Sequence, residues 1–234
     1  KNNIVFVGSG SVNDINKITE KNLNLLETSV QYNYFYCIRD GDFGARVHNE
    51  FKSEGKKLFT LTRYHIENYL LDEEMIFKVI KKSSKNNFTN PAQVLDALRK
   101  TILKRKDEIV NKLIEDKINF ELHIDRFTLS GEVPATNRLP AITNYFNNLH
   151  VIRKNQVEIE SIVVNCENEF SEIMNNDKWK KVLPGRDILN YFVGDYFNRV
   201  MYYVDLRDNL IDMIKAENKV PEELKNIMKE ILDH

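Results

Sequence analysis

Asp40 and Asp42 are the residues whose type and spacing suggest chemistry most directly. They lie in the segment Ile38-Arg39-Asp40-Gly41-Asp42-Phe43, at the end of an apolar run. Side chains two residues apart on an extended segment project to the same side, so both carboxylates can contact one hard cation such as Mg²⁺ or Mn²⁺. The alternative is a turn in which Asp42 caps a following helix.

Glu67 supplies a third carboxylate, in the segment His65-Ile66-Glu67-Asn68-Tyr69 that follows another apolar run. Three converging carboxylates would repel one another without a cation between them. We therefore predict Asp40, Asp42 and Glu67 as metal ligands and catalytic residues. Alternatively, Glu67 is an acid that the dipole favours at a helix N-terminus, and His65 is a weaker ligand candidate because histidine more often packs or hydrogen-bonds.

Two further segments could contact phosphate groups. Gly8-Ser9-Gly10-Ser11 follows the apolar run 4–7 and is typical of a turn that cradles phosphate at a helix N-terminus, although it lacks the third glycine of a dinucleotide fingerprint and the lysine of a P-loop. A basic cluster at 180–186 precedes an amphipathic pattern. A plain glycine turn and a solvated charged surface are the alternatives. The predicted phosphate or nucleic-acid contacts are Gly8, Ser9, Gly10, Ser11, Arg63, Lys181 and Arg186.

The elements that must position these residues alternate between strands and helices over residues 1–80. Apolar runs at 4–7, 34–38 and 58–61 predict strands, and the patterns at 12–26 and 43–54 predict helices between them. Such connections are right-handed and make neighbouring strands parallel, so the polar clusters should meet at one edge of the sheet. We predict an α/β core with a Rossmann-like, mostly parallel sheet.

Residues 81–234 predict a mainly helical extension that packs on this core. Asn90 and Pro91 begin a long amphipathic pattern, and further helical patterns follow to the end of the chain. A strand-like segment at 120–124 and a loop with Gly131, Pro134 and Pro140 are expected to interrupt the helices.

Composition restricts the class of protein. Lys and Arg number 34 against 35 for Asp and Glu, so any polyanion site must be a local patch. Cys37 and Cys166 lie in apolar patterns and predict buried free thiols in a reducing compartment. No signal peptide or membrane-length apolar run is present, which predicts a cytoplasmic protein without a membrane partner. The start at Lys1, almost inside an apolar run, suggests a C-terminal portion of a longer chain or a trimmed tag.

Several of these segments resemble the Toprim domains of OLD-like nucleases, and more closely a divergent Toprim family joined to or encoded beside ABC-type ATPases in bacterial anti-phage systems. The resemblance covers about residues 1–80 and rests on 6–14, 38–43, and Arg63 with 66–71. It implies a Toprim fold, Mg²⁺- or Mn²⁺-dependent nuclease activity, and nucleic acid and an ABC-type ATPase as partners. Residues 184–189 resemble a Gly-Lys helix start of that family, with Arg186 in place of the lysine.

One departure from the family pattern keeps other functions open. The first-strand glutamate of Toprim domains is replaced here by Gly8 and Ser9. Either Glu67 compensates in a remodelled site, or the module is non-catalytic and docks on an ATPase, a partner protein or nucleic acid. A dinucleotide-binding domain is a third alternative, and a homo-oligomer is compatible with each.

Overall fold

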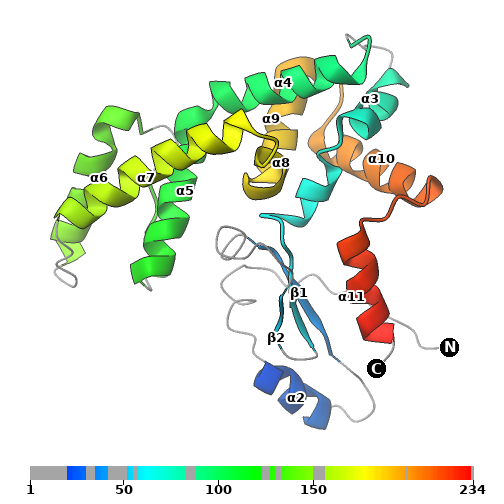
Figure 1. Ribbon diagram of the computed structural model, residues 1–234, viewed down its shortest axis with the longest axis horizontal. Helices are drawn as coiled ribbons and strands as arrows, with labels where there is room; N and C mark the ends of the chain where they lie inside the picture. Colours follow the sequence, from blue (N-terminus) through cyan, green and yellow to red (C-terminus); the bar gives the residue numbers. More distant parts are fainter. Residues whose placement is uncertain are drawn as a thin grey trace.

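Helices dominate the computed structural model of the protein, and a small sheet lies at one end of the molecule beside α2 and α11 (Figure 1). The structure describes residues 20–29, 35–41, 52–54, 57–82, 88–122, 127–129, 133–149, 156–198 and 200–232. All structural statements below refer to these ranges.

The sheet has three short strands in the order β1-β3-β2. They are β1 (Cys37–Arg39), β2 (Lys52–Glu54) and β3 (Leu58–Thr60). Strand β1 pairs with β3 in parallel, with Ile38 opposite Phe59. Strand β2 is antiparallel to β3 and forms the other edge. The parallel pair coincides with two predicted strands, whereas β2 was not predicted.

The predicted Toprim/Rossmann-like α/β fold is wrong. In the described residues the protein is mostly helical, and β1 with β3 is the single parallel strand pair. Each strand is three residues long, so the sheet is too small to organise layers of helices on both its faces. The helices of the longer C-terminal part instead form the main core around their own apolar faces.

Three local predictions also differ from the structure. Of the predicted helix 43–54, residues 43–51 lie outside the described residues. Its end, Lys52–Glu54, is a strand, where pairing with β3 outweighs a weak helical pattern. The strand-like segment 120–124 is helical up to Leu122, where α5 (Lys106–Leu122) ends, and its last two residues lie outside the described residues. Pro140, expected in a loop, lies within α6. The predicted strand 4–7 lies outside the described residues, and α2 (Glu20–Ser29) overlaps the end of the predicted helix 12–26.

The helical part begins with the 3₁₀-helix η1 (Ile66–Leu70) and contains most of the buried apolar residues. Local signals set its helix starts: Asp72 accepts a hydrogen bond from the Met75 amide, and Asn90 does the same for Gln93 ahead of Pro91. The elements after η1 are α3 (Glu73–Lys81), α4 (Pro91–Lys104), α5 (Lys106–Leu122), α6 (Ala135–Leu149), α7 (Gln156–Asn175), α8 (Trp179–Val182), α9 (Gly185–Phe197), α10 (Tyr203–Ala216) and α11 (Glu222–Leu232).

Helix α11 packs against the sheet although it comes from the other end of the sequence (Figure 1). Its Ile227 is fully buried against Phe59 and Leu61. Its Glu223 accepts hydrogen bonds from the Thr62 amide (2.7 Å), the Thr62 hydroxyl (2.6 Å) and the Tyr69 hydroxyl. The last helix therefore holds the segment that joins β3 to η1.

Two expectations from composition can be compared with the described residues. Cys37 is partly buried, Cys166 is buried, and both are free thiols. None of the described helices is both long enough and apolar enough to span a membrane.

Candidate functional site

The carboxyl ends of β1 and β3 lie side by side, and the residues after them form the candidate site. The Leu61 amide donates to the Arg39 carbonyl (3.0 Å), and the Gly41 amide donates to the Arg63 carbonyl (2.9 Å). A side chain at position 41 would not fit, because a Cβ atom there would lie 2.4 Å from the Leu61 carbonyl oxygen. Gly41 thus allows the close approach that brings Asp40 to the segment before η1.

Asp40 contacts the start of η1. Its Oδ1 accepts a hydrogen bond of 2.8 Å from the Ile66 amide. Burial raises the pKa of Asp40; the Ile66 amide and Arg186 oppose this effect, and the nearby negative charge of Glu67 adds to it. Asp40 and Glu67 are therefore electrostatic neighbours.

Glu67 is a buried carboxylate with half of its acceptor capacity in use. Its residue exposure is 7%, and its Oε1 accepts hydrogen bonds from Arg186 Nε (2.8 Å) and the Tyr203 hydroxyl (3.1 Å). Its Oε2 is buried and has no hydrogen-bond partner among the residues that the structure describes. Burial by itself would raise the pKa of Glu67, but the hydrogen bond from Arg186 contributes most to an overall lowering. Glu67 therefore stays ionised at neutral pH.

Asn68 connects η1 to the start of α9 and so places Arg186 next to Glu67. Its Nδ2 donates to the Leu183 carbonyl (2.6 Å), and its Oδ1 accepts from the amides of His65 (2.8 Å) and Gly185 (3.2 Å). A Cβ atom at position 185 would lie 2.6 Å from Asn68 Oδ1. The contact between the two segments requires glycine at this position.

His65 lies beside the two carboxylates but has the properties of a neutral, buried side chain. Its exposure is 8%, and its buried Nδ1 has no hydrogen-bond partner in the described ranges. Burial, together with the positive charge of Lys112, lowers the pKa of His65 to about 4. The ring packs edge-on against Tyr64, with 4.7 Å between centroids. At neutral pH the imidazole therefore carries no charge that could offset the carboxylates.

Arg63 and Lys181 line a hollow of about 490 Å³ between the β3–η1 segment and the region around α8. Arg63 lies over the ring of Tyr69, 4.5 Å from its centroid, and donates from Nη1 to the Asn68 carbonyl (2.8 Å). Lys180, also in the lining, forms an ion pair with Glu73. The two predicted phosphate contacts thus share one polar hollow, which Asp72, Glu73, Glu74 and Asp177 also line. Arg186 points instead to Glu67.

The other predicted site residues cannot be placed in this geometry. Asp42 and the turn Gly8, Ser9, Gly10 and Ser11 lie outside the described residues. Sequence reasoning also missed Tyr203, whose hydroxyl contacts Glu67, and it missed the connecting role of Asn68. Tyr203 belongs to an apolar helical stripe, and nothing in the sequence marks it as a site residue. Asn68 could have been found, because an amide side chain beside apolar residues indicates a buried hydrogen-bond network.

The donor set fits a hard divalent cation in part. Within the described ranges no group of three or more His, Cys, Asp or Glu side chains is arranged to hold a metal ion. Asp40 and Glu67 nevertheless supply neighbouring carboxylates, and the buried Oε2 of Glu67 lacks a partner. Oxygen donors of this kind suit Mg²⁺ and Mn²⁺. Asp42 would complete the predicted set of three.

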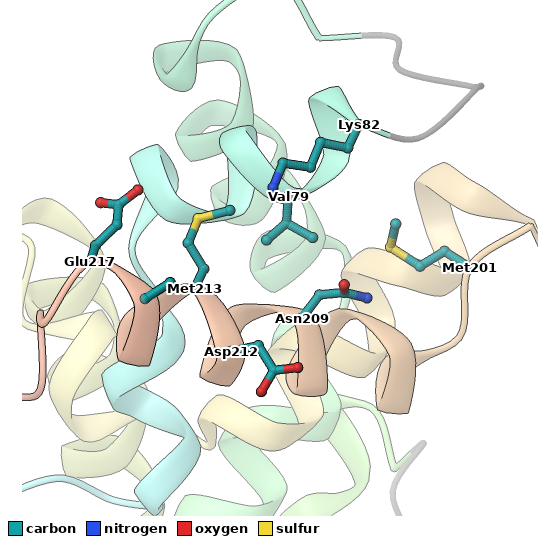
Figure 2. A pocket seen from close by; sticks show the side chains of 8 residues that line it. Val79, Lys82, Met201, Asn209, Asp212, Met213 and Glu217 are labelled. Atoms are coloured by element: carbon teal, nitrogen blue, oxygen red, sulfur yellow. The ribbon is translucent and has the colours of Figure 1, made fainter.

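A separate hollow of about 500 Å³ between α3 and α10 has different chemistry (Figure 2). Apolar Val79 and Met213 and polar Asn209 and Asp212 line it. Of the two carboxylates in its wall, Asp212 lies 3.5 Å from Lys215, and Glu217 pairs with Lys78 (2.8 Å) and with Lys219. Two lysines therefore neutralise the charge of Glu217. In Glu67, by contrast, Oε2 has no hydrogen-bond partner among the described residues.

Comparisons with known proteins give no match: no family model, curated protein or solved structure is similar to this chain. The resemblance to the Toprim family of OLD-like nucleases therefore stays a prediction from the motifs.

Proposed function

We propose that the protein is a Mg²⁺- or Mn²⁺-dependent nuclease that cleaves phosphodiester bonds at the site formed by Asp40, Asp42 and Glu67. The observation that carries the proposal is the buried, unpartnered Oε2 of Glu67, next to a second carboxylate whose pKa is raised. A buried carboxylate oxygen without a donor has a large desolvation cost. A bound cation would remove that cost.

The residues around the two carboxylates would divide the work of the reaction. A divalent cation held by the carboxylates would neutralise phosphate charge and activate water for attack. Arg63 and Lys181, in their shared hollow, would orient the nucleic-acid backbone. Asn68 and Gly41 would hold the backbone segments that carry Glu67 and Asp40 at a fixed distance from each other.

The biological setting belongs to the same proposal. The motif resemblance supports a nuclease that acts with an ABC-type ATPase, as a domain or subunit, in bacterial anti-phage defence. In that setting the substrate is DNA or RNA in the cytoplasm, and the helical part would serve as the partner-binding region.

One observation favours a second candidate, a non-catalytic module that docks on an ATPase, another protein or nucleic acid. Glu67 already has a cationic partner in Arg186, with Nε and Oε1 2.8 Å apart. A permanent ion pair would make the carboxylate structural. The experiment below separates the two functions.

The test is to incubate the purified chain with Mn²⁺ or Mg²⁺ and with plasmid, single-stranded DNA or transfer RNA. We expect cleavage that is lost with chelator and falls at least a hundredfold in Asp40→Asn and in Glu67→Gln, because each change removes an anionic ligand. Glu222→Gln, a change at an exposed acid on α11, is the matched control and should retain activity. Intact substrates under every metal condition would support the docking module.

A further inference from the structure

Arg186 pairs with the same carboxylate that would hold the proposed cation, at the oxygen opposite the unpartnered Oε2. Its Nε lies 2.8 Å from Glu67 Oε1. In the described residues it is the cationic partner of this acid, and a neutral hydroxyl, that of Tyr203, shares the same oxygen. The ion pair therefore competes with any metal ion for the charge of Glu67.

The two members of the pair differ greatly in burial. The side chain of Glu67 is 8% exposed, whereas that of Arg186 is 53% exposed. Glu67 is fixed within η1, while the guanidinium reaches it from the surface. If the ion pair breaks, the arginine side chain can therefore move into solvent while the carboxylate stays in place.

The helix that carries Arg186 does not favour a positive charge at this position. Arg186 is in the first turn of α9, which begins at Gly185. The N-terminus of a helix carries partial positive charge, so a cation there is repelled by the dipole. The backbone is meanwhile anchored by the hydrogen bond from the Gly185 amide to Asn68 (3.2 Å). The side chain can therefore leave without disturbing the helix start.

We propose that Arg186 is a displaceable counter-ion that neutralises Glu67 in the metal-free protein and is released when a divalent cation binds. This regulation of the site rests on the metal site of the proposed function. Once released, the guanidinium extends from α9 with its donors free for an anionic group, such as a phosphate of the nucleic-acid substrate. The ion pair is then the metal-free state of the site, and its presence does not mean that the site has lost metal binding.

The decisive measurement is the Mn²⁺ affinity of the full chain, by titration calorimetry or electron paramagnetic resonance, in the wild type and in Arg186→Gln. Removing the competing charge should tighten Mn²⁺ binding by roughly tenfold, since two cations a few ångströms apart repel strongly near a protein surface. Arg186→Lys keeps the charge and should bind Mn²⁺ within about threefold of the wild type. Arg99→Gln, in the exposed pair with Asp177, is the matched control and should not change the affinity.

A second readout follows the arginine directly. Phenylglyoxal modification of Arg186, quantified by mass spectrometry, should become several-fold faster when Mn²⁺ is added, whereas the modification rate of Arg99 should stay constant. Circular dichroism of each variant establishes that it is folded. A properly folded Arg186→Gln that binds Mn²⁺ no more tightly than the wild type, or more weakly, overturns the counter-ion role.

These outcomes separate the two proposals. If the wild type binds Mn²⁺, Glu67→Gln does not, and Arg186→Gln is unchanged, the metal site stands and the counter-ion role fails. If neither the wild type nor Arg186→Gln binds Mn²⁺, the metal site itself fails, and with it both proposals.

Discussion

Glu67 and Arg138 are both buried charged residues, but their surroundings differ. The Arg138 side chain is 1% exposed and donates to Asn111 Oδ1 (2.6 Å), to Asp107 Oδ1 (2.6 Å) and to Glu167. All three guanidinium nitrogens have acceptors. Glu67 has two donors at Oε1 and, within the described part of the chain, none at Oε2.

The comparison shows how a structural charge differs from a charge that is available to a ligand. Arg138 connects α6 with α5 and α7, and each of its three guanidinium nitrogens donates to an acceptor within the protein. Glu67 connects η1 with α9 and α10 and retains an unused acceptor. Since buried polar atoms are nearly always paired in folded proteins, the unpaired oxygen is the stronger indication of function.

The largest expected effect comes from breaking the satisfied network. Arg138→Met should lower the free energy of unfolding by about 3 kcal/mol, because it leaves the buried Asn111 oxygen without its donor and two carboxylates without their cation. Urea denaturation measures the change. Arg99→Met, which removes an exposed ion pair, should cost far less, and a loss for Arg138→Met equal to that control would refute the structural role.

A smaller effect is expected where η1 meets the start of α9, at the contact between Asn68 and Gly185. Gly185→Ala should destabilise the protein by roughly 2 kcal/mol, because the added Cβ would lie 2.6 Å from Asn68 Oδ1 and must displace it. Gly194→Ala on the same helix meets no atom within 4 Å and should stabilise the protein by up to about 1 kcal/mol through helix propensity. Thermal unfolding of both variants tests the pair. Equal effects at the two positions would contradict the close contact.

The anchoring of the site segment by α11 predicts a further, smaller loss. Glu223→Gln weakens the hydrogen bonds from Thr62 and Tyr69, and should cost about 1.5 kcal/mol. Hydrogen exchange at the Thr62 amide should become faster in this variant. In Glu222→Gln both the stability and the exchange rate should stay as in the wild type, and faster exchange there would argue against a specific role for Glu223.

The smallest effect concerns an acid in the helical region that lacks a cationic hydrogen-bond partner among the described residues. Burial raises the pKa of Glu115 to about 7, with the negative charge of Asp116 adding to the shift, and the Leu129 amide donates to its Oε1. The folded state therefore holds a proton that the unfolded state releases near pH 4.5. Stability from this group is present below pH 4.5 and is lost as the pH rises to about 7.

Because Glu115 is only partly buried, solvent screening should reduce this contribution to roughly 1 kcal/mol or less. Glu115→Gln cannot titrate, so its difference in unfolding free energy from the wild type should grow between pH 5 and pH 8. Urea denaturation at several pH values measures this difference. A difference that is independent of pH would show that Glu115 titrates normally in the folded protein.

Local sequence patterns predicted part of the fold, including the parallel strand pair that places Asp40 beside the segment after β3. The apolar runs at 34–38 and 58–61 overlap β1 and β3, and their parallel pairing places the residues after each strand next to each other. Asn90 with Pro91 identified the start of α4. Wrong predictions came at Lys52–Glu54 and at 120–122, where short segments with mixed signals follow their tertiary partners. The prediction of a Rossmann-like sheet was wrong for a related reason: strand patterns in the sequence do not show how many strands pair in one sheet.

By itself, the sequence determined local elements such as β1, β3 and the start of α4, and the chemical types available near Asp40 and Glu67. Helix caps, apolar periodicity and charge are properties of neighbouring residues. Only the tertiary structure decided that Arg186 and Tyr203 share one oxygen of Glu67, that Asn68 joins η1 to α9, and that α11 anchors the segment after β3. These contacts join residues more than 100 positions apart, and no local pattern encodes them. They depend on how the helical core brings distant segments together.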